Sequence, residues 1–387
     1  MNDFKKPFID FYNRHNIIPV AQDISDIEVH FQRRSAMYRH CGIPPVLVKG
    51  RHVLEIGPGT GHNALYTNFL GPAEYVLVDA AQQSIRKLEN LFDSFFEDIS
   101  NCEIIESTLE DLELDRKFDI VLCEGAIPFQ KNPCGFLGTV ADFAGPSGIV
   151  LVTCADSVSY FSEILRRIMG CLLLARIPSD TGFSDKLEIL RPVFSGHLEN
   201  LKGMSRPVDD WICDNILQPF LGIPMSIADA VQALADNFYV YGSSPHIFTD
   251  WRWYKDIHGR DQGFNEIALE VFWSNVHNLM DYRHVFEPCS SDIGKRLMQL
   301  CSRIFDLSIQ IQNSGPEISC LETIQENLGK IRAIFSQFSP ETGSAMEEFE
   351  NRIDSFISGR DPDFSDMPAF APWFGRGQQY LSFIRKD

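Results

Sequence analysis

The sequence predicts an α/β fold in which helices cover both faces of a mostly parallel sheet, giving a three-layer sandwich. Three observations predict it. Short apolar runs alternate with amphipathic segments between residues 51 and 155. The first of these runs leads directly into a glycine-rich turn. The rest of the chain has mostly helical patterns, so we expect N-terminal helices and large helical insertions around this core.

Five apolar runs form the predicted sheet of the core, residues 51–155. Each is almost continuously apolar, as expected for parallel strands that are covered on both faces. In chain order they are HVLEIG, EYVLVD, CEIIES, FDIVLCEG and GIVLVTC. Amphipathic segments such as AAQQSIRKLENLFDSFFEDI separate them. Right-handed crossovers wind such a succession into a Rossmann-like sandwich.

The segment before the core, residues 1–50, has a helical pattern. Ser25 and Glu28 have the spacing of a capping box, in which two side chains satisfy free amide groups at a helix start. Gly42 and the proline pair that begins at Pro44 end the pattern.

After the core the chain turns mostly helical over residues 156–235, which we expect to be an insertion and a lid over the substrate. Residues 236–258 hold a strand-like run, NFYVYGSS, and an aromatic cluster. A second helical region, 259–360, follows. Within 361–387 an alternating pattern predicts a final strand over Gln379–Ile384. We expect these two strand-like runs to return to the core sheet and complete it.

Composition limits the function classes. The chain has 387 residues with 34 basic and 53 acidic side chains, for a net charge of −19, which disfavours nucleic acid as a partner. Its ten cysteines are scattered without a C-x-x-C pair, as is typical of a reducing compartment. The charged N-terminus does not resemble a signal peptide, and no apolar run reaches the roughly 18 residues of a membrane span. We therefore expect a cytoplasmic protein; the sequence carries no signal of its oligomeric state.

The glycine-rich turn has the sequence EIGPGTG, in which Gly57, Gly59 and Gly61 have the spacing G-x-G-x-G. A strand, a glycine-rich turn and a helix form a nucleotide-shaped site, but dinucleotide-binding enzymes use G-x-G-x-x-G. Glu55 stands two positions before the first glycine, and its carboxylate would repel a pyrophosphate. It would not repel a ligand with an ammonium and a sulfonium group, so the pattern favours S-adenosylmethionine over NAD.

With these residues the chain resembles the class I S-adenosylmethionine-dependent methyltransferases over about residues 51–155. The resemblance implies that Asp79, which ends the second run eighteen residues after Gly61, binds the ribose hydroxyls of the donor. It implies that Thr108 and Leu109, in the segment STLEDL, lie at the adenine, with a threonine in place of the family's usual acid. It places Glu124 at the end of the fourth strand, facing the cofactor cleft.

The sequence marks the methyl acceptor less clearly. Enzymes that methylate base nitrogens or glutamine amides carry an Asn/Asp-Pro-Pro-aromatic motif after the fourth strand, and this chain has EGAIP there. We see no carboxylate cluster for a metal ion, which favours metal independence. Two inserted segments concentrate polar and aromatic residues. Histidines in them can act as bases, and aromatic faces can stack on sugars or rings. The candidates are His197 and His246 for catalysis, and Trp211, Asp214, Trp251 and Tyr254 for the substrate.

A plainer interpretation of these residues remains open: the aromatic side chains pack the inserted helices, and the aspartates cap them. Our leading expectation is a methyltransferase that modifies an oxygen or nitrogen of a small molecule or a glycan precursor. A protein methyltransferase is the first alternative. A non-catalytic S-adenosylmethionine-binding protein is the second, since a fold alone does not give activity. An NAD-dependent oxidoreductase is disfavoured by the glycine spacing.

Overall fold

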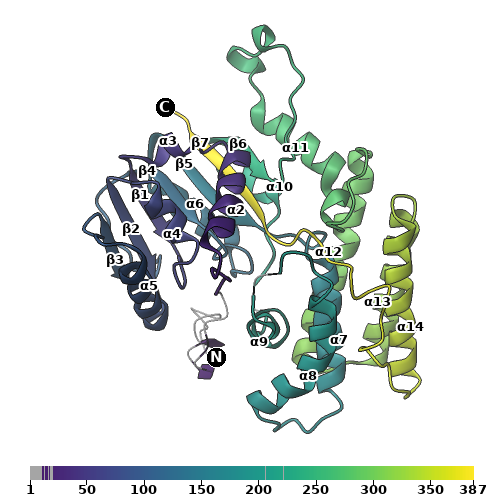
Figure 1. Cartoon of the computed structure of the whole chain (residues 1–387). Helices are drawn as coiled ribbons and strands as arrows, with labels where there is room; N and C mark the ends of the chain where they lie inside the picture. Colours follow the sequence, from purple (N-terminus) through teal and green to yellow (C-terminus); the bar gives the residue numbers. More distant parts are fainter. Residues whose placement is uncertain (1–10, 13, 16, 18–20, 205, 221) are drawn as a thin grey trace. The chain divides into compact units, whose positions relative to one another are not determined.

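The structure is a computed structural model that describes residues 11–12, 14–15, 17, 21–204, 206–220 and 222–387. The chain divides into two compact units, which are described separately. Unit 1 consists of Met1–Ala155, Leu221–Phe272 and Gln378–Asp387, and unit 2 of Asp156–Phe220 and Trp273–Gly377. Figure 1 shows the sheet of unit 1 and the helices of unit 2.

Unit 1 contains a seven-stranded sheet in the order β3-β2-β1-β4-β5-β7-β6. The first five strands of the chain pair in parallel, and β7 runs antiparallel to both β5 and β6. The predicted Rossmann-like fold with a mostly parallel sheet is confirmed. The strands are β1 (His52–Ile56), β2 (Glu74–Asp79), β3 (Cys102–Glu106), β4 (Phe118–Cys123), β5 (Ala144–Cys154), β6 (Phe238–Ser244) and β7 (Gln379–Arg385).

Helices cover both faces of this sheet. On one face, side chains of α2, α3, α4 and α5 form an apolar cluster with alternate residues of the central strands, such as Val53, Leu77 and Leu122. The intervening residues, such as Leu54 and Val121, are also fully buried, and α6 and α10 pack beside β4, β5 and β6. The helices are α2 (Ile27–His40), α3 (Pro45–Val48), α4 (Ala64–Phe69), α5 (Gln82–Phe95), α6 (Pro133–Asp142) and α10 (Ile227–Leu234).

The start of α2 corrects one detail of the sequence interpretation. The cap is Asp26, whose Oδ1 accepts the amide of Val29 at 3.1 Å. Ser25 instead donates its own amide to Asp23 Oδ1 at 2.9 Å, so the predicted capping box is wrong by one residue. Aspartate and serine both accept from free helix amides, and spacing alone does not decide between neighbours. The helix ends at His40, as the following glycine at position 42 predicts.

Unit 2 is helical. Its long helices α12, α13 and α14 pack side by side in sequence order, and α7 packs on α12 (Figure 1). Short helices precede them, including a π-helical turn, η1, directly after α9. The lid role expected for residues 156–235 stays a prediction. The elements are α7 (Phe161–Leu174), α8 (Phe183–Leu198), α9 (Val208–Ile212), η1 (Cys213–Leu217), η4 (Val276–Leu279), α12 (Ser291–Ser314), α13 (Ile318–Phe335) and α14 (Pro340–Ile357). Helix α11 (Phe264–Asn275) runs from unit 1 into unit 2.

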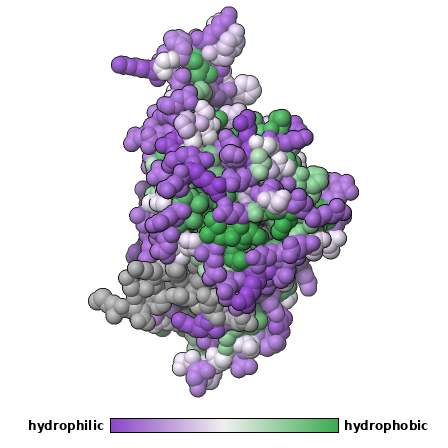
Figure 2. All heavy atoms as spheres, turned by 90° about the vertical axis from the view of Figure 1, so that its left-hand side faces the viewer, coloured by the Kyte–Doolittle hydropathy of each residue, from purple (hydrophilic) through white to green (hydrophobic). Residues whose placement is uncertain are grey.

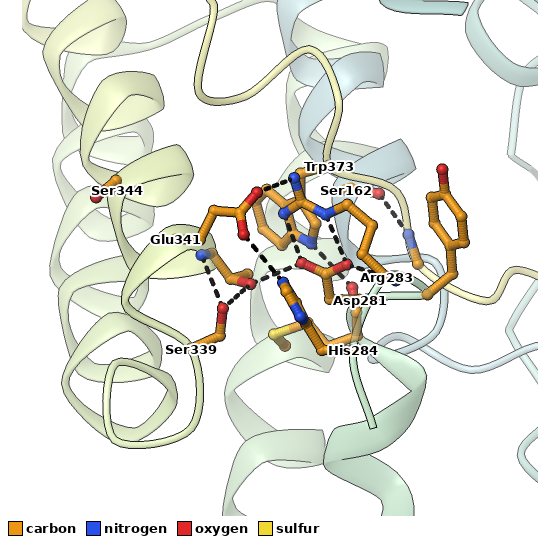
Figure 3. A network of polar contacts seen from close by, with 12 residues as sticks. Ser162, Asp281, Arg283, His284, Ser339, Glu341, Ser344 and Trp373 are labelled. Carbon is orange, nitrogen blue, oxygen red and sulfur yellow. Dashed lines mark hydrogen bonds and ion pairs between the residues drawn. The ribbon is translucent and has the colours of Figure 1, made fainter. Parts of the chain in front are cut away.

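A buried polar network fixes the segment after η4 to the start of α14 (Figure 3). Asp281, with 0% exposure, accepts hydrogen bonds from the guanidinium of Arg283 at 2.7 Å and from the hydroxyl of Thr342 at 2.7 Å. Arg283 also pairs with Glu341 at 2.7 Å. The indole of Trp373 donates to the carbonyl of Met280 at 2.9 Å. Because its charge is paired and hydrogen-bonded, the buried carboxylate of Asp281 is tolerated here.

Within the described part of the chain, no helix combines the length and the apolar character that crossing a membrane would require. On the face shown in Figure 2, hydrophilic side chains surround a group of hydrophobic side chains near the middle.

Candidate functional site

The glycine-rich turn lies between β1 and α4, at the carboxyl edge of the parallel strands. Gly57, Gly59 and Gly61 have φ values of 74°, 58° and 82°, in the left-handed region that favours glycine. A Cβ atom on Gly57 would lie only 3.2 Å from the Cβ of Ala126. The positive φ values and this contact disfavour side chains in the turn, and a backbone without side chains can approach a nucleotide-like ligand closely.

Asp79, at the end of β2, forms a cradle together with this turn. Its Oδ2 accepts the amide of Gly59 at 3.0 Å, and its Oδ1 accepts the amide of Ala81 at 2.8 Å. Burial raises the pKa of Asp79 to about 6, against the lowering effect of these two amides. The group is therefore mostly ionised at neutral pH. A carboxylate has about four lone-pair sites, so two amide donors leave room for the two hydroxyls of a ribose.

The surroundings of Glu55 differ from those that the sequence predicts for it. It is buried, and it accepts the hydroxyl of Tyr75 from the neighbouring strand β2. Burial first, and then the charge of Glu124, raises the pKa of Glu55 to about 7. The carboxyl group is thus only partly ionised at neutral pH, and it is not the permanent negative charge that the sequence argument assumed. Its contact with the cofactor stays a prediction.

Glu124 follows β4 at the same edge and is held by α2. Arg34 donates both terminal nitrogens to it, at 2.8 and 2.5 Å, and Asn63 donates at 3.3 Å. His30, one turn before Arg34, contacts the carbonyl of His62 in the glycine-rich turn at 2.9 Å. A helix outside the predicted core therefore completes the site and neutralises one of its carboxylates.

Arg34 is not among the residues that the sequence predicts for the site. A usable signal was present, because Arg34 lies three and four residues before the apolar residues Met37 and Tyr38, and this spacing forms one apolar stripe on a helix. An arginine within such a stripe faces the interior and requires an anionic partner. The spacing does not identify that partner, which is 90 residues away in the chain.

Thr108 and Leu109 follow β3 and are both mostly buried. The hydroxyl of Thr108 donates to Asp111 at 2.7 Å and accepts the amide of Asp111 at 3.2 Å. These bonds shape a tight turn beside Ser107, whose amide donates to the carbonyl of Asp79 at 3.1 Å. The structure thus brings the β3 turn to the Asp79 end of the cradle, while the adenine contacts of Thr108 and Leu109 stay predictions.

The predicted base His197 lies inside unit 2 and does not fit a catalytic role. Its Nδ1 accepts from Arg166 at 3.2 Å, and its Nε2 contacts the carbonyl of Phe364 at 3.3 Å. Burial, and then the charge of Arg166, lowers the pKa of His197 to about 3. Such a histidine is neutral at neutral pH, and both of its ring nitrogens already have hydrogen-bond partners. These surroundings disfavour His197 as a base, and His246 remains the predicted base.

The two predicted substrate residues of unit 2, Trp211 and Asp214, also have partners within the fold. Trp211 is buried, with its ring centroid 5.7 Å from that of Phe194, which fits the plainer interpretation that it packs the inserted helices. Asp214, in the π-helical turn, pairs with Arg206 at 2.9 Å and is about a quarter exposed. Residue type could not separate a packing tryptophan from one that binds a substrate.

The predicted residues of unit 1 are instead accessible. His246 is exposed, with its ring centroid 6.0 Å from that of His40 at the end of α2. Trp251 is 93% exposed and Tyr254 is 72% exposed, in a segment of short 3-10 turns between β6 and α11 (Figure 1). Both side chains are accessible to solvent, unlike Trp211, and their contact with a substrate stays a prediction.

Metal ligands do not cluster in the described ranges: no three His, Cys, Asp or Glu side chains there lie close enough to hold an ion.

Comparison with known proteins supports the assignment of the core. Residues 47–172 match the family described as a methyltransferase domain. Two curated relatives, each named probable protein arginine N-methyltransferase 6.2, come from the indica and japonica subspecies of Oryza sativa. Each is 28% identical over 108 residues, which is 27% of this chain and 27% of the relative. The chain thus spans only about a quarter of the length of these relatives.

Solved structures of methyltransferases are also similar to the chain. PKMT2 from Rickettsia typhi in complex with AdoHcy is 17% identical, with 62% of this chain and 49% of that chain covered and a TM-score of 0.39. Magnesium protoporphyrin IX methyltransferase from Synechocystis with bound SAM is 15% identical, with coverages of 38% and 74% and a TM-score of 0.31. The family match shows a methyltransferase domain over residues 47–172, and the order of the strands agrees with it.

Proposed function

We propose that the protein transfers the methyl group of S-adenosylmethionine to an oxygen or nitrogen atom of a small molecule or a glycan precursor. The observation that carries the methyl-transfer part is the cradle formed by the glycine-rich turn and Asp79. Its glycine-rich backbone and its ionised carboxylate fit an adenosyl group.

When bound, S-adenosylmethionine supplies a methyl group that its sulfonium already activates. Asp79 would hold the ribose hydroxyls, and the Gly59 amide fixes the rotamer of Asp79. Arg34 forms an ion pair with Glu124. The net negative charge at this edge of the sheet is therefore smaller than the charge that its carboxylates would have without Arg34. His246 is our candidate for accepting the proton of an acceptor hydroxyl, since an oxygen nucleophile needs a base. A neutral amine acceptor would not need one.

The accessible aromatic segment of unit 1 supports the small-molecule or glycan class. Trp251 and Tyr254 present apolar faces with polar tips, which stack on sugars and ring systems. A second candidate, methylation of a basic protein, is favoured by the names of the rice relatives. The net charge of −19 agrees with it, because an acidic surface attracts basic targets.

A transfer experiment separates the two classes of acceptor. The purified chain is incubated with S-adenosylmethionine carrying a deuterated methyl group and, in parallel, with the small-molecule and protein fractions of a cell extract. We expect mass spectrometry to find the labelled methyl group in the small-molecule fraction. The Asp79→Ala variant is the matched control and should transfer far less label. Label confined to proteins would replace our proposal with the protein class, and label in neither fraction would contradict methyl transfer itself.

A further inference from the structure

Another buried arginine, Arg167, lies in unit 2. Arg167, in α7, is 1% exposed. Its Nη1 donates to the side-chain oxygen of Gln312 at 3.0 Å, and its guanidinium carbon lies 3.5 Å from the ring centroid of Phe220. The same Gln312 oxygen accepts the amide of Phe220 at 3.0 Å. One nitrogen and one face of the guanidinium are therefore used to fix its position.

The rest of this guanidinium is not satisfied. Nε and Nη2 of Arg167 are buried, and no acceptor among the described residues lies within hydrogen-bond reach of either. These two nitrogens form one edge of the planar group, with parallel N–H bonds spaced for two oxygens of one carboxylate or phosphate. Burying a charged donor without an acceptor costs folding free energy. The Nε–Nη2 edge of Arg167 therefore needs an explanation.

The adjacent arginine shows that the fold can satisfy such a group. Arg166 is equally buried, but its nitrogens donate to His197 at 3.2 Å and to the carbonyl of Ala371 at 3.0 Å. Burial lowers the pKa of Arg167 to about 10, partly countered by Cys171 and Asp214, so the group stays charged at neutral pH. Asp214 itself is paired with Arg206.

The helix that carries Arg167 is packed closely on the π-helical turn η1. A Cβ atom on Gly170, three residues along α7, would lie 2.4 Å from Ile216 of η1. Irregular turns of this type often occur at functional sites. The charge of Asp214 acts on Arg167, and Asp214 is about one quarter exposed.

From this geometry we infer that Arg167 is the anchor of an oxyanion-binding site in unit 2, which takes the carboxylate or phosphate group of a small acidic ligand through its Nε–Nη2 edge. The ring of Phe220 and the side-chain oxygen of Gln312 hold the guanidinium of Arg167 in place before the ligand binds. This preorganisation lowers the entropy cost of binding. This inference goes beyond the proposed function and does not depend on it.

Calorimetry with two simple anions tests the site. Inorganic phosphate and acetate are titrated separately into the full chain, with ionic strength held constant by sodium chloride. We expect one anion per chain, and at least tenfold weaker binding in Arg167→Met, because two charge-assisted hydrogen bonds are lost. The anion that binds more tightly identifies the ligand group as phosphate or carboxylate. Arg296→Met, an exposed arginine on α12, is the matched control and should bind the anion like the wild type.

The unfolding midpoint in anion-free buffer supplies a second readout. Arg167→Met should be at least as stable as the wild type there, because the change removes a buried charge that lacks a full set of partners. A marked fall in the midpoint would mean that the guanidinium already has its partners within the fold, and would overturn the site. Binding of neither anion by the wild type, or equal binding by Arg167→Met, would also overturn it.

Discussion

Asp79→Ala is expected to weaken the binding of adenosylhomocysteine by about 1.5 to 3 kcal/mol, the range for hydrogen bonds to a charged group. The carboxylate lies where the turn and β2 meet, and the Gly59 and Ala81 amides fix both of its oxygens. A ribose bound there would make two further charge-assisted bonds. Titration calorimetry at pH 7.5 measures the loss, since Asp79, with a pKa of about 6, is then ionised.

Two controls separate a lost ligand contact from a lost turn. Asp93→Ala removes an exposed carboxylate from α5 and should bind adenosylhomocysteine like the wild type. Asp79→Asn keeps an acceptor oxygen for one amide, so it should keep the fold but bind weakly. Wild-type affinity in Asp79→Ala would reject the ribose role.

Asp281→Ala is expected to lower the stability of unit 2 by about 3 to 5 kcal/mol, the usual cost of removing one partner of a buried ion pair. The change leaves Arg283, which is 16% exposed, with Glu341 as its remaining carboxylate partner, and it removes one of the two acceptors of the Thr342 hydroxyl. Because the network joins the segment after η4 to α14, we expect the amides of Pro340–Ile357 to exchange faster. Hydrogen-exchange mass spectrometry measures this locally.

Asp306→Ala, on the exposed side of α12, is the matched control and should change stability by less than about 0.5 kcal/mol. Unchanged exchange in α14 of Asp281→Ala would show that the network does not stabilise unit 2. Adenosylhomocysteine binding by the same variant reports on unit 1, which does not contain the network.

The strands of unit 1 could be predicted because the signal of a buried parallel strand is local. Each of the five apolar runs becomes a strand, and the alternating run that begins at Gln379 becomes β7. The glycine spacing likewise predicts a turn with left-handed residues, and all three glycines have positive φ. These features depend on neighbours in the chain, so sequence reasoning reaches them.

The pairing of distant side chains could not be predicted. Arg34 pairs with Glu124, which is 90 residues away in the chain. The carboxyl group of Glu55 accepts a hydrogen bond from a tyrosine of another strand. The two histidine candidates have the same residue type, but one is enclosed in the core of unit 2 and the other is exposed in unit 1. Residue type limits the chemistry that a side chain can perform. Its burial and its hydrogen-bond partners decide its protonation state in the fold.

We propose that the cradle at the carboxyl edge of β1 and β2 is built for an adenosyl donor rather than for a dinucleotide. Titration of the wild-type chain with adenosylhomocysteine and, separately, with NAD⁺ tests it most directly. We predict that one adenosylhomocysteine binds per chain and that NAD⁺ gives no measurable heat of binding. Binding of NAD⁺ without binding of adenosylhomocysteine would contradict the account.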